Sequence, residues 1–199
     1  MATASTPLPR PLVLADLVPA VRARNVVLVT AGALFMALLA QLSVPVPGSP
    51  VPITGQTLGV VLTAAALGPA RGTLVQVFYI LAGVVGLPFY SEASSGVEVV
   101  LGATGGYLVG FIPAAYLIGL AARRGRDRNV LTALPLFIAG QAVIFAVGVP
   151  WLAVTTGMDA GQALDAGFYP FILGGIVKAV IAAAVLGGTW ALVQRARVH

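Results

Sequence analysis

The sequence predicts an all-α, polytopic membrane protein with six transmembrane helices and both chain ends in the cytoplasm. Of its 199 residues, 59% are hydrophobic and only 9% are charged, against roughly a quarter charged in soluble domains. The apolar residues form six stretches, separated by short segments rich in Pro, Gly or Arg. All arginines fall on one side of a six-span arrangement. A chain of this length normally forms one domain.

The first 24 residues are predicted to be a cytoplasmic segment and not a cleavable signal. The apolar stretch at 12–21 is interrupted by Asp16 and Pro19, and Arg22 and Arg24 follow it. A signal peptide instead has an unbroken apolar region with positive charge before it. The membrane domain is then expected at 25–193, and residues 194–199 form a cytoplasmic tail.

Six spans are predicted in order along the chain. The first covers 26–44 and is stopped by prolines, because the loop 45–53 holds four of them and cannot be helical throughout. The others are expected at 54–67, 73–87, 101–122, 130–154 and 168–193.

The second and third spans are shorter than the ~20 residues that a perpendicular crossing needs. A re-entrant hairpin is therefore the alternative. It would leave Arg71 near the membrane centre, at a cost of at least about 2.5–3.5 kcal/mol. Two full spans place Arg71 in the cytoplasm, and we prefer them.

Positive charge sets the orientation. The opposite loops carry no Lys or Arg, so the positive-inside rule places the arginine side in the cytoplasm. The net charge of +5 then reports topology and not nucleic-acid binding, because no basic face is interleaved with aromatic residues. The arginines are Arg10, Arg22, Arg24, Arg71, Arg123, Arg124, Arg126, Arg128, Arg195 and Arg197.

Lys178 is the only lysine, and it lies inside the sixth predicted span. It follows the outer end of the span by about ten residues, which places it roughly 15 Å deep. An ammonium there should face the bundle interior and have a partner. Either backbone carbonyls supply that partner, or a ligand's carboxylate does, since no Asp or Glu lies deep in a span. The second alternative predicts a pocket for a small anionic molecule.

Further polar and small residues collect at the outer ends or the middle of the spans. Each alone is more often helix–helix contact than ligand contact. Together with Lys178 they predict an outward-facing cavity beneath the loops 45–53 and 88–100. These candidate substrate-binding residues are Gln41, Thr54, Gln56, Thr104, Gly105, Gly106, Tyr107 and Gln141.

Other sequence features bear on partners and catalysis. Ala33 and Ala37 are four residues apart in the first span and could admit a partner helix closely. No Walker A motif exists, because Lys178 is followed by Ala179. There is no cysteine and the single histidine is His199, the last residue. We therefore expect no catalytic residue, no metal site and no enzymatic activity.

Five motifs together resemble those of the biotin-specific substrate-binding subunits (S components) of energy-coupling factor transporters, the BioY family. They occur in family order and cover about residues 25–193. They are PVPITGQTL (50–58), LGPARG (67–72), GLPF (86–89), GATGGYLVGF (102–111) and PFILGGIVK (170–178).

The resemblance implies a subunit of the bacterial plasma membrane that captures biotin from outside, as a transported ligand and not a cofactor. Its partners would be a transmembrane coupling protein and two cytoplasmic ATPases. Lys178 matches the family's pocket lysine, whereas the Asp usual three residues earlier is replaced by Gly175. The same scaffold for another small carboxylate, and a non-transporting membrane scaffold, are the alternatives.

Overall fold

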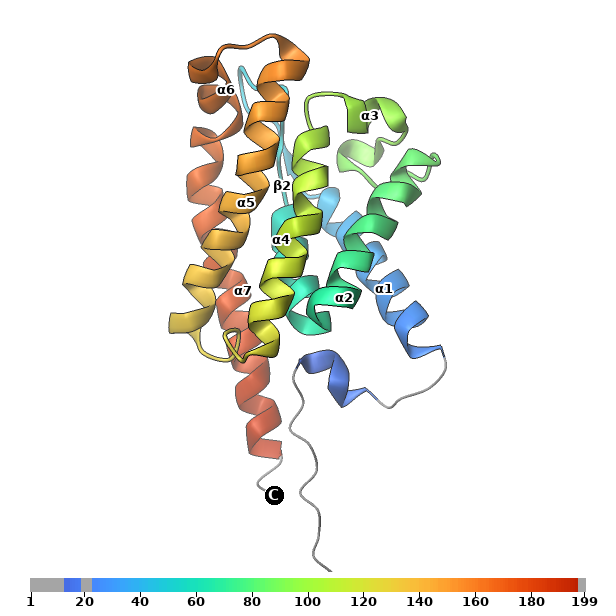
Figure 1. The fold of residues 1–199 in the computed structure, drawn as a ribbon, viewed down its shortest axis with the longest axis vertical. Helices are drawn as coiled ribbons and strands as arrows, with labels where there is room; N and C mark the ends of the chain where they lie inside the picture. Colours follow the sequence, from blue (N-terminus) through green and yellow to red (C-terminus); the bar gives the residue numbers. More distant parts are fainter. Residues whose placement is uncertain (1–12, 19–22, 197–199) are drawn as a thin grey trace, which may run out of the picture.

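The computed structural model describes residues 13–18 and 23–196, and long helices run along its long axis (Figure 1). This confirms the predicted all-α class, apart from one small two-stranded sheet. The long helices are α1 (Arg24–Ala40), α2 (Gln56–Val84), α4 (Gly105–Arg123), α5 (Val130–Thr156) and α7 (Tyr169–Ala196). The short elements are η1 (Leu14–Leu17), β1 (Ser43–Val44), β2 (Ile53–Thr54), η2 (Ser91–Ala93), α3 (Val97–Leu101) and α6 (Ala160–Gly167).

Four helical stretches in the described residues are long and apolar enough to cross a membrane: α2, α4, α5 and the run from α6 through α7. Helix α1 is apolar as well, but it has only 17 residues. The number of six crossings therefore stays a prediction.

Helix α2 is continuous along the chain, but it forms two legs in space. Gly68 breaks it with φ +83° and ψ 178°, a conformation that glycine adopts without strain. Pro69 then opens the second leg, in the first helical turn, where proline is tolerated. A Cβ on Gly72 would lie 2.7 Å from Ala64 Cα. The legs correspond to the second and third predicted spans.

Polar contacts show that these legs run antiparallel. Gln76 Nε2 donates to Thr63 Oγ1 at 3.1 Å, and further from the break Gln56 Nε2 donates to the Tyr79 hydroxyl at 2.6 Å. Later residues of the second leg thus meet earlier residues of the first. The chain turns back on itself at Gly68.

The turn of α2 lies at the end of the bundle that carries the arginines. The side chain of Val13 packs against Gly68, and Val13 is only 2% exposed. Arg71 Nη1 lies 3.6 Å from Asp16 Oδ1, and its Nε donates to Asn25 Oδ1 at 2.9 Å. These contacts tie the N-terminal segment to the turn.

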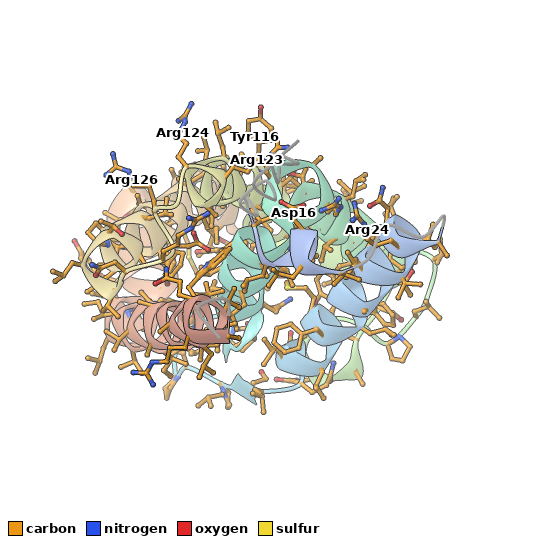
Figure 2. All side chains as sticks on the ribbon, turned by 90° about the horizontal axis from the view of Figure 1, so that it is seen from below. Asp16, Arg24, Tyr116, Arg123, Arg124 and Arg126 are labelled. Atoms are coloured by element: carbon orange, nitrogen blue, oxygen red, sulfur yellow. The ribbon has the colours of Figure 1, made fainter. Side chains whose placement is uncertain are left out.

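The described arginines lie at one end of the molecule, as the charge pattern predicts. Figure 2 views that end from below, with Arg24, Arg123, Arg124 and Arg126 labelled around Asp16. Arg195 lies in the last turn of α7, at the same end. Arg10, Arg22, Arg197 and His199 lie outside the described residues.

Helix α4 packs between α2 and α5 at very short distances. A Cβ on Gly106 would lie 2.2 Å from Trp151 Cβ, and one on Gly119 would lie 2.5 Å from the Pro69 nitrogen. Real Cβ atoms do not approach other atoms so closely, so both contacts require glycine.

The position of Ala33 and Ala37 revises the prediction that they receive a partner helix. They are 0% and 8% exposed, because α1 turns its small residues toward α2. The opposite face of α1 exposes Leu34 (54%) and Leu38 (66%). Small-residue spacing here packs two helices of the same chain.

Candidate functional site

A β-hairpin, residues 43–54, leads from α1 to α2 at the end opposite the arginines (Figure 1). Its two short strands are antiparallel, with Ser43 opposite Thr54 and Val44 opposite Ile53. Between them the four prolines of the loop limit the chain to extended and turn conformations. Val51 of this loop is 6% exposed and points into the molecule.

Lys178 of α7 reaches this hairpin. Its Nζ donates to the backbone carbonyl of Thr54 at 2.8 Å. The ion pair found in the described part of the chain joins Arg71 to Asp16 and does not involve Lys178. Of the two alternatives from the sequence, the carbonyl bond is therefore present. An ammonium has three N–H donors, so Lys178 can still bind a second group.

Lys178 lines a cavity of about 50 Å³ beneath the hairpin. Its walls come from the hairpin, the first leg of α2, the loop before α3, and helices α3, α4, α5 and α7. Six of the nine predicted binding residues meet there: Lys178, Thr54, Gln56, Thr104, Tyr107 and Gln141. The other lining residues are Val51, Pro52, Thr57, Tyr90, Ser91, Val99, Leu108, Phe111, Ile144, Phe145 and Phe171.

A chain of hydrogen bonds fixes the polar side of the cavity. Thr54 Oγ1 donates to Gln56 Oε1 at 2.7 Å, and Gln56 Nε2 donates to the Tyr79 hydroxyl. That hydroxyl donates in turn to the Phe89 carbonyl at 3.1 Å. The chain links the hairpin, both legs of α2 and the following loop, so it orients Gln56 before any ligand is present.

Gln141 and Gly175 form a second polar contact, between α5 and α7. Gln141 Nε2 donates to the Gly175 carbonyl at 2.8 Å, and a Cβ on Gly175 would lie 2.6 Å from Gln141 Oε1. The amide of Gln141 therefore occupies the space that a side chain at 175 would need.

A neighbouring apolar groove of about 220 Å³ runs between α5 and α7. Three residues line both the groove and the cavity, namely Gln141, Phe145 and Phe171. They form one wall shared by the two spaces.

Comparison with known proteins agrees with this architecture. A family model described as the BioY family matches residues 12–195. The chain belongs to the BioY family. A BioY relative from Thermotoga maritima, described as a biotin transporter, is 38% identical over 142 residues, which are 71% of this chain and 82% of the relative. Another, from Rhodobacter capsulatus and also described as a biotin transporter, is 36% identical over 176 residues, 81% of this chain and 90% of the relative.

The fold of this BioY chain is also that of a solved structure. It matches the 2.1 Å crystal structure of an S-component for biotin from an ECF-type ABC transporter with a TM-score of 0.76. The match covers 86% of this chain and 94% of the other, at 23% sequence identity. The order of the five motifs along the sequence is thus accompanied by a common arrangement of helices.

Three predicted binding residues of the BioY chain lie outside the cavity lining. Gln41 Nε2 donates to the carbonyls of Ala37 and Tyr90, and its Oε1 accepts from the Ala93 amide at 2.9 Å. It therefore holds the loop around η2. Gly105 and Gly106 are packing residues, because they let Val100 and Trp151 approach the start of α4.

Several lining residues are not among the nine predicted binding residues. Thr57 stands out, because its buried Oγ1 has no hydrogen-bond partner within the described chain. It stands beside Gln56 at the outer start of the second predicted span, so its position and polarity pointed to the same cavity. Apolar lining residues such as Leu108 and Ile144 carry no such signal, since core and cavity positions share the same residue types.

The polar groups around the cavity suit hydrogen bonding to an anionic ligand more than metal binding. Among residues 13–18 and 23–196, no group of three or more His, Cys, Asp or Glu side chains is placed to hold a metal ion. What the cavity offers is one ammonium, hydroxyls and amides, surrounded by aromatic and aliphatic side chains.

Proposed function

We propose that this chain is the biotin-binding S component of an energy-coupling factor transporter, capturing biotin at the end opposite the arginines. Family membership and the names of its relatives support a transport protein and not an enzyme. The observation that carries the ligand assignment is Lys178, an ammonium at a buried cavity with donors to spare and no carboxylate partner among the described residues.

Biotin fits the chemistry of the lining. Its carboxylate would accept from Lys178, in a charge-assisted hydrogen bond. The ureido group has both donors and acceptors, which the hydroxyl of Thr57 and the amide of Gln141 can complement. The sulfur-containing ring and the aliphatic chain would lie against aromatic side chains such as Phe145 and Phe171.

The size of the cavity implies movement on binding. About 50 Å³ holds only a few water molecules, at 10–15 Å³ each, whereas pockets for drug-sized ligands occupy roughly 300–1,000 Å³. The hairpin is the wall attached to α7 by the Lys178–Thr54 bond. A ligand larger than the cavity would have to push this wall outward, so ligand entry and hairpin displacement would favour one another.

A titration of the purified subunit tests the ligand. Biotin and its uncharged methyl ester are compared on the native chain and on Lys178→Met, which keeps the apolar stem. We expect the variant to bind biotin 10- to 150-fold more weakly, equivalent to about 1.5–3 kcal/mol, and to bind the ester almost as the native chain does. Equal losses for both ligands would show that Lys178 acts only by holding the hairpin.

The same titration separates the alternatives. Desthiobiotin, which lacks the sulfur ring, should bind more weakly than biotin if the aromatic wall contacts that ring. A different small carboxylate that binds more tightly than biotin would reassign the ligand. A subunit that binds none of them would favour the non-transporting scaffold.

We further propose that a transmembrane coupling protein and two cytoplasmic ATPases drive uptake across the bacterial plasma membrane. The S-component fold of the matched structure supports this, and this chain has no Walker A lysine of its own. Because the small residues of α1 face inward, we propose its exposed face, with Leu34 and Leu38, as the docking surface.

Bulky substitution tests that surface. Leu34→Trp together with Leu38→Trp should abolish ATP-driven biotin uptake in cells and leave biotin binding by the purified subunit unchanged. Leu131→Trp on α5 is the control, because Leu131 is 82% exposed on another helix. Normal uptake by the double variant would place docking elsewhere, and concentrative uptake by the subunit alone in liposomes would remove the need for ATPases.

A further inference from the structure

The turn between α4 and α5 concentrates positive charge. Within residues 123–128 there are four arginines. One, Arg128, packs its guanidinium over the ring of Trp190, 4.5 Å from the ring centre. The side chains of the other three are exposed, and none of their guanidinium groups forms a hydrogen bond or ion pair with any described residue; they are Arg123, Arg124 and Arg126.

The fold does not use these three guanidinium groups to complete the helix end. The Ala121 carbonyl already accepts from the backbone amides of Arg124 (3.0 Å) and Arg126 (3.2 Å), and the Ala122 carbonyl accepts from Gly125 at 2.8 Å. Two of the last carbonyls of α4, which basic side chains often bind, are therefore occupied.

The acid of the turn does not neutralise them either. Asp127 is completely buried, and its Oδ2 accepts a hydrogen bond from Trp190 Nε1 at 2.8 Å. The carboxylate thus points into the protein while the neighbouring arginines point out. Three uncompensated positive charges remain on the surface.

Their direction points to the membrane. Figure 2 shows Tyr116, Arg124 and Arg126 along one edge of the molecule, projecting sideways from the bundle, with Arg123 beside them. Tyr116 is 51% and Leu117 47% exposed. Leu117 and Arg124 lie seven residues apart on the same face of α4, roughly 10 Å along the axis.

An exposed apolar face that ends in a tyrosine and arginines matches the profile of a phospholipid. Acyl chains would cover Leu117, the phenol of Tyr116 would lie at the interface, where tyrosines are enriched, and the phosphate would meet the guanidinium groups. Guanidinium binds phosphate in a bidentate geometry. The uncompensated charge favours a lipid with net negative charge over a zwitterionic one.

We propose that this edge, formed by Tyr116, Arg123, Arg124 and Arg126, binds the headgroup of an anionic phospholipid in the leaflet at the arginine end. The positive-inside distribution assigns that leaflet to the cytoplasm. An acidic protein surface is the competing partner. The sideways projection of the side chains favours lipid, because a soluble partner approaches from the end of the bundle.

Lipid titration of the purified full chain, read by native mass spectrometry, tests this proposal. Phosphatidylglycerol and phosphatidylcholine are compared on the native chain and on Arg124→Gln/Arg126→Gln. The matched control is Arg24→Gln/Arg195→Gln, which removes the same charge from the same end but outside the cluster. Arg123 is not substituted, because the aliphatic part of its side chain packs beside Gly68 and its loss could disturb the turn of α2.

We expect the cluster variant to bind phosphatidylglycerol about thirtyfold more weakly, from about 1 kcal/mol per basic residue. Its binding of phosphatidylcholine should not change, and the control should lose less than threefold. Arg124→Lys/Arg126→Lys, which keeps the charge, should recover most of the affinity. Each variant should have the same thermal unfolding midpoint as the native chain. This measurement tests whether the variant is folded and does not depend on biotin binding.

Three results would overturn the proposal. One is equal binding of the two lipids by the native chain. Another is a control variant that loses as much phosphatidylglycerol as the cluster variant. The third is a cluster variant that keeps its lipid but no longer copurifies with the coupling ATPases, which would assign the edge to a protein partner.

Discussion

Lys178 of α7 and Thr54 of the hairpin are joined by a 2.8 Å hydrogen bond, although 124 positions separate them in the sequence. The bond runs from a side-chain ammonium to a backbone carbonyl, so it constrains the hairpin itself and not one of its side chains. Removal of the ammonium would leave the two-residue strand pairs as the main backbone restraint on that segment.

We therefore expect Lys178→Ala to loosen the hairpin in the ligand-free protein. Amides of residues 43–54 should exchange with solvent about 10- to 150-fold faster, because a hydrogen bond to a charged group contributes about 1.5–3 kcal/mol. Hydrogen–deuterium exchange by mass spectrometry measures this directly. Arg195→Ala serves as the control for loss of a positive charge from α7. Identical exchange in both variants would mean that the hairpin is held by other contacts.

Thr57 provides a test of the ligand's polar contacts. Its buried hydroxyl has no partner in the described chain and lines the cavity, whereas the hydroxyl of Thr73 is equally unpartnered but lies away from it. Thr57→Val should weaken biotin binding about fivefold, the effect of one neutral hydrogen bond. Thr73→Val should leave the affinity unchanged.

Both substitutions remove a buried hydroxyl that lacks a partner, so both should leave the ligand-free protein as stable or slightly more stable. Thermal unfolding with and without biotin separates the two effects. A loss of affinity in both variants would indicate a general packing change and not a ligand contact.

Adjacent glycines of α7 give a matched pair. A Cβ at 175 would lie 2.6 Å from Gln141 Oε1, while a Cβ at 174 would meet only Ile53 Cγ2, at an ordinary 3.7 Å. Gly174→Ala should bind biotin normally and gain helix stability. Gly175→Ala should displace the Gln141 amide and bind biotin several-fold more weakly. Equal affinities would show that Gln141 has no part in binding.

Asp127 should make stability depend on pH in the acidic range. Burial raises the pKa of Asp127, and the hydrogen bond from Trp190 and the charge of Arg128 oppose this shift with smaller effects. Between the unfolded and the raised folded pKa, the folded protein holds a proton that the unfolded chain has released. Stability from this group is therefore full below the unfolded pKa and falls as pH rises through that window.

Asp127→Asn removes the titration. As pH is lowered from about 7 toward about 4, the native chain should gain thermal stability relative to the Asn variant. Unfolding midpoints of both proteins at several pH values give the comparison, with Asp165→Asn at an exposed position as the control. A difference between native and variant that does not change with pH would contradict the expectation.

Strong local patterns in the sequence predicted most of this structure. Long apolar stretches located the helices, and the arginines located one end of the bundle. The break at Gly68–Pro69 was visible because both residues interrupt a helix, and the place of Lys178 inside the last long helix followed from the apolar stretch around it. Each of these signals depends on a few neighbouring residues.

Features that depend on distant residues were not predictable in the same way. The spacing of Ala33 and Ala37 indicates that another helix packs closely against them, but it does not indicate which helix. In the structure, that helix is α2 of the same chain. Gln41 has a polar side chain at the outer end of its span, as a binding residue would. Two of its hydrogen-bond partners, however, are backbone groups 49 and 52 positions away. The strands β1 and β2 are two residues each, too short to leave a pattern.

The wall formed by Gln141, Phe145 and Phe171 has a practical consequence. It is one side chain thick, with the cavity on one side and the groove between α5 and α7 on the other. Detergent tails, short-chain lipids and a native bilayer would fill that groove differently and press differently on the same two aromatic rings. The dissociation constant measured for biotin would then depend on the detergent or lipid that surrounds the protein. Dissociation constants of two variants can be compared only when both variants are measured in the same detergent or lipid.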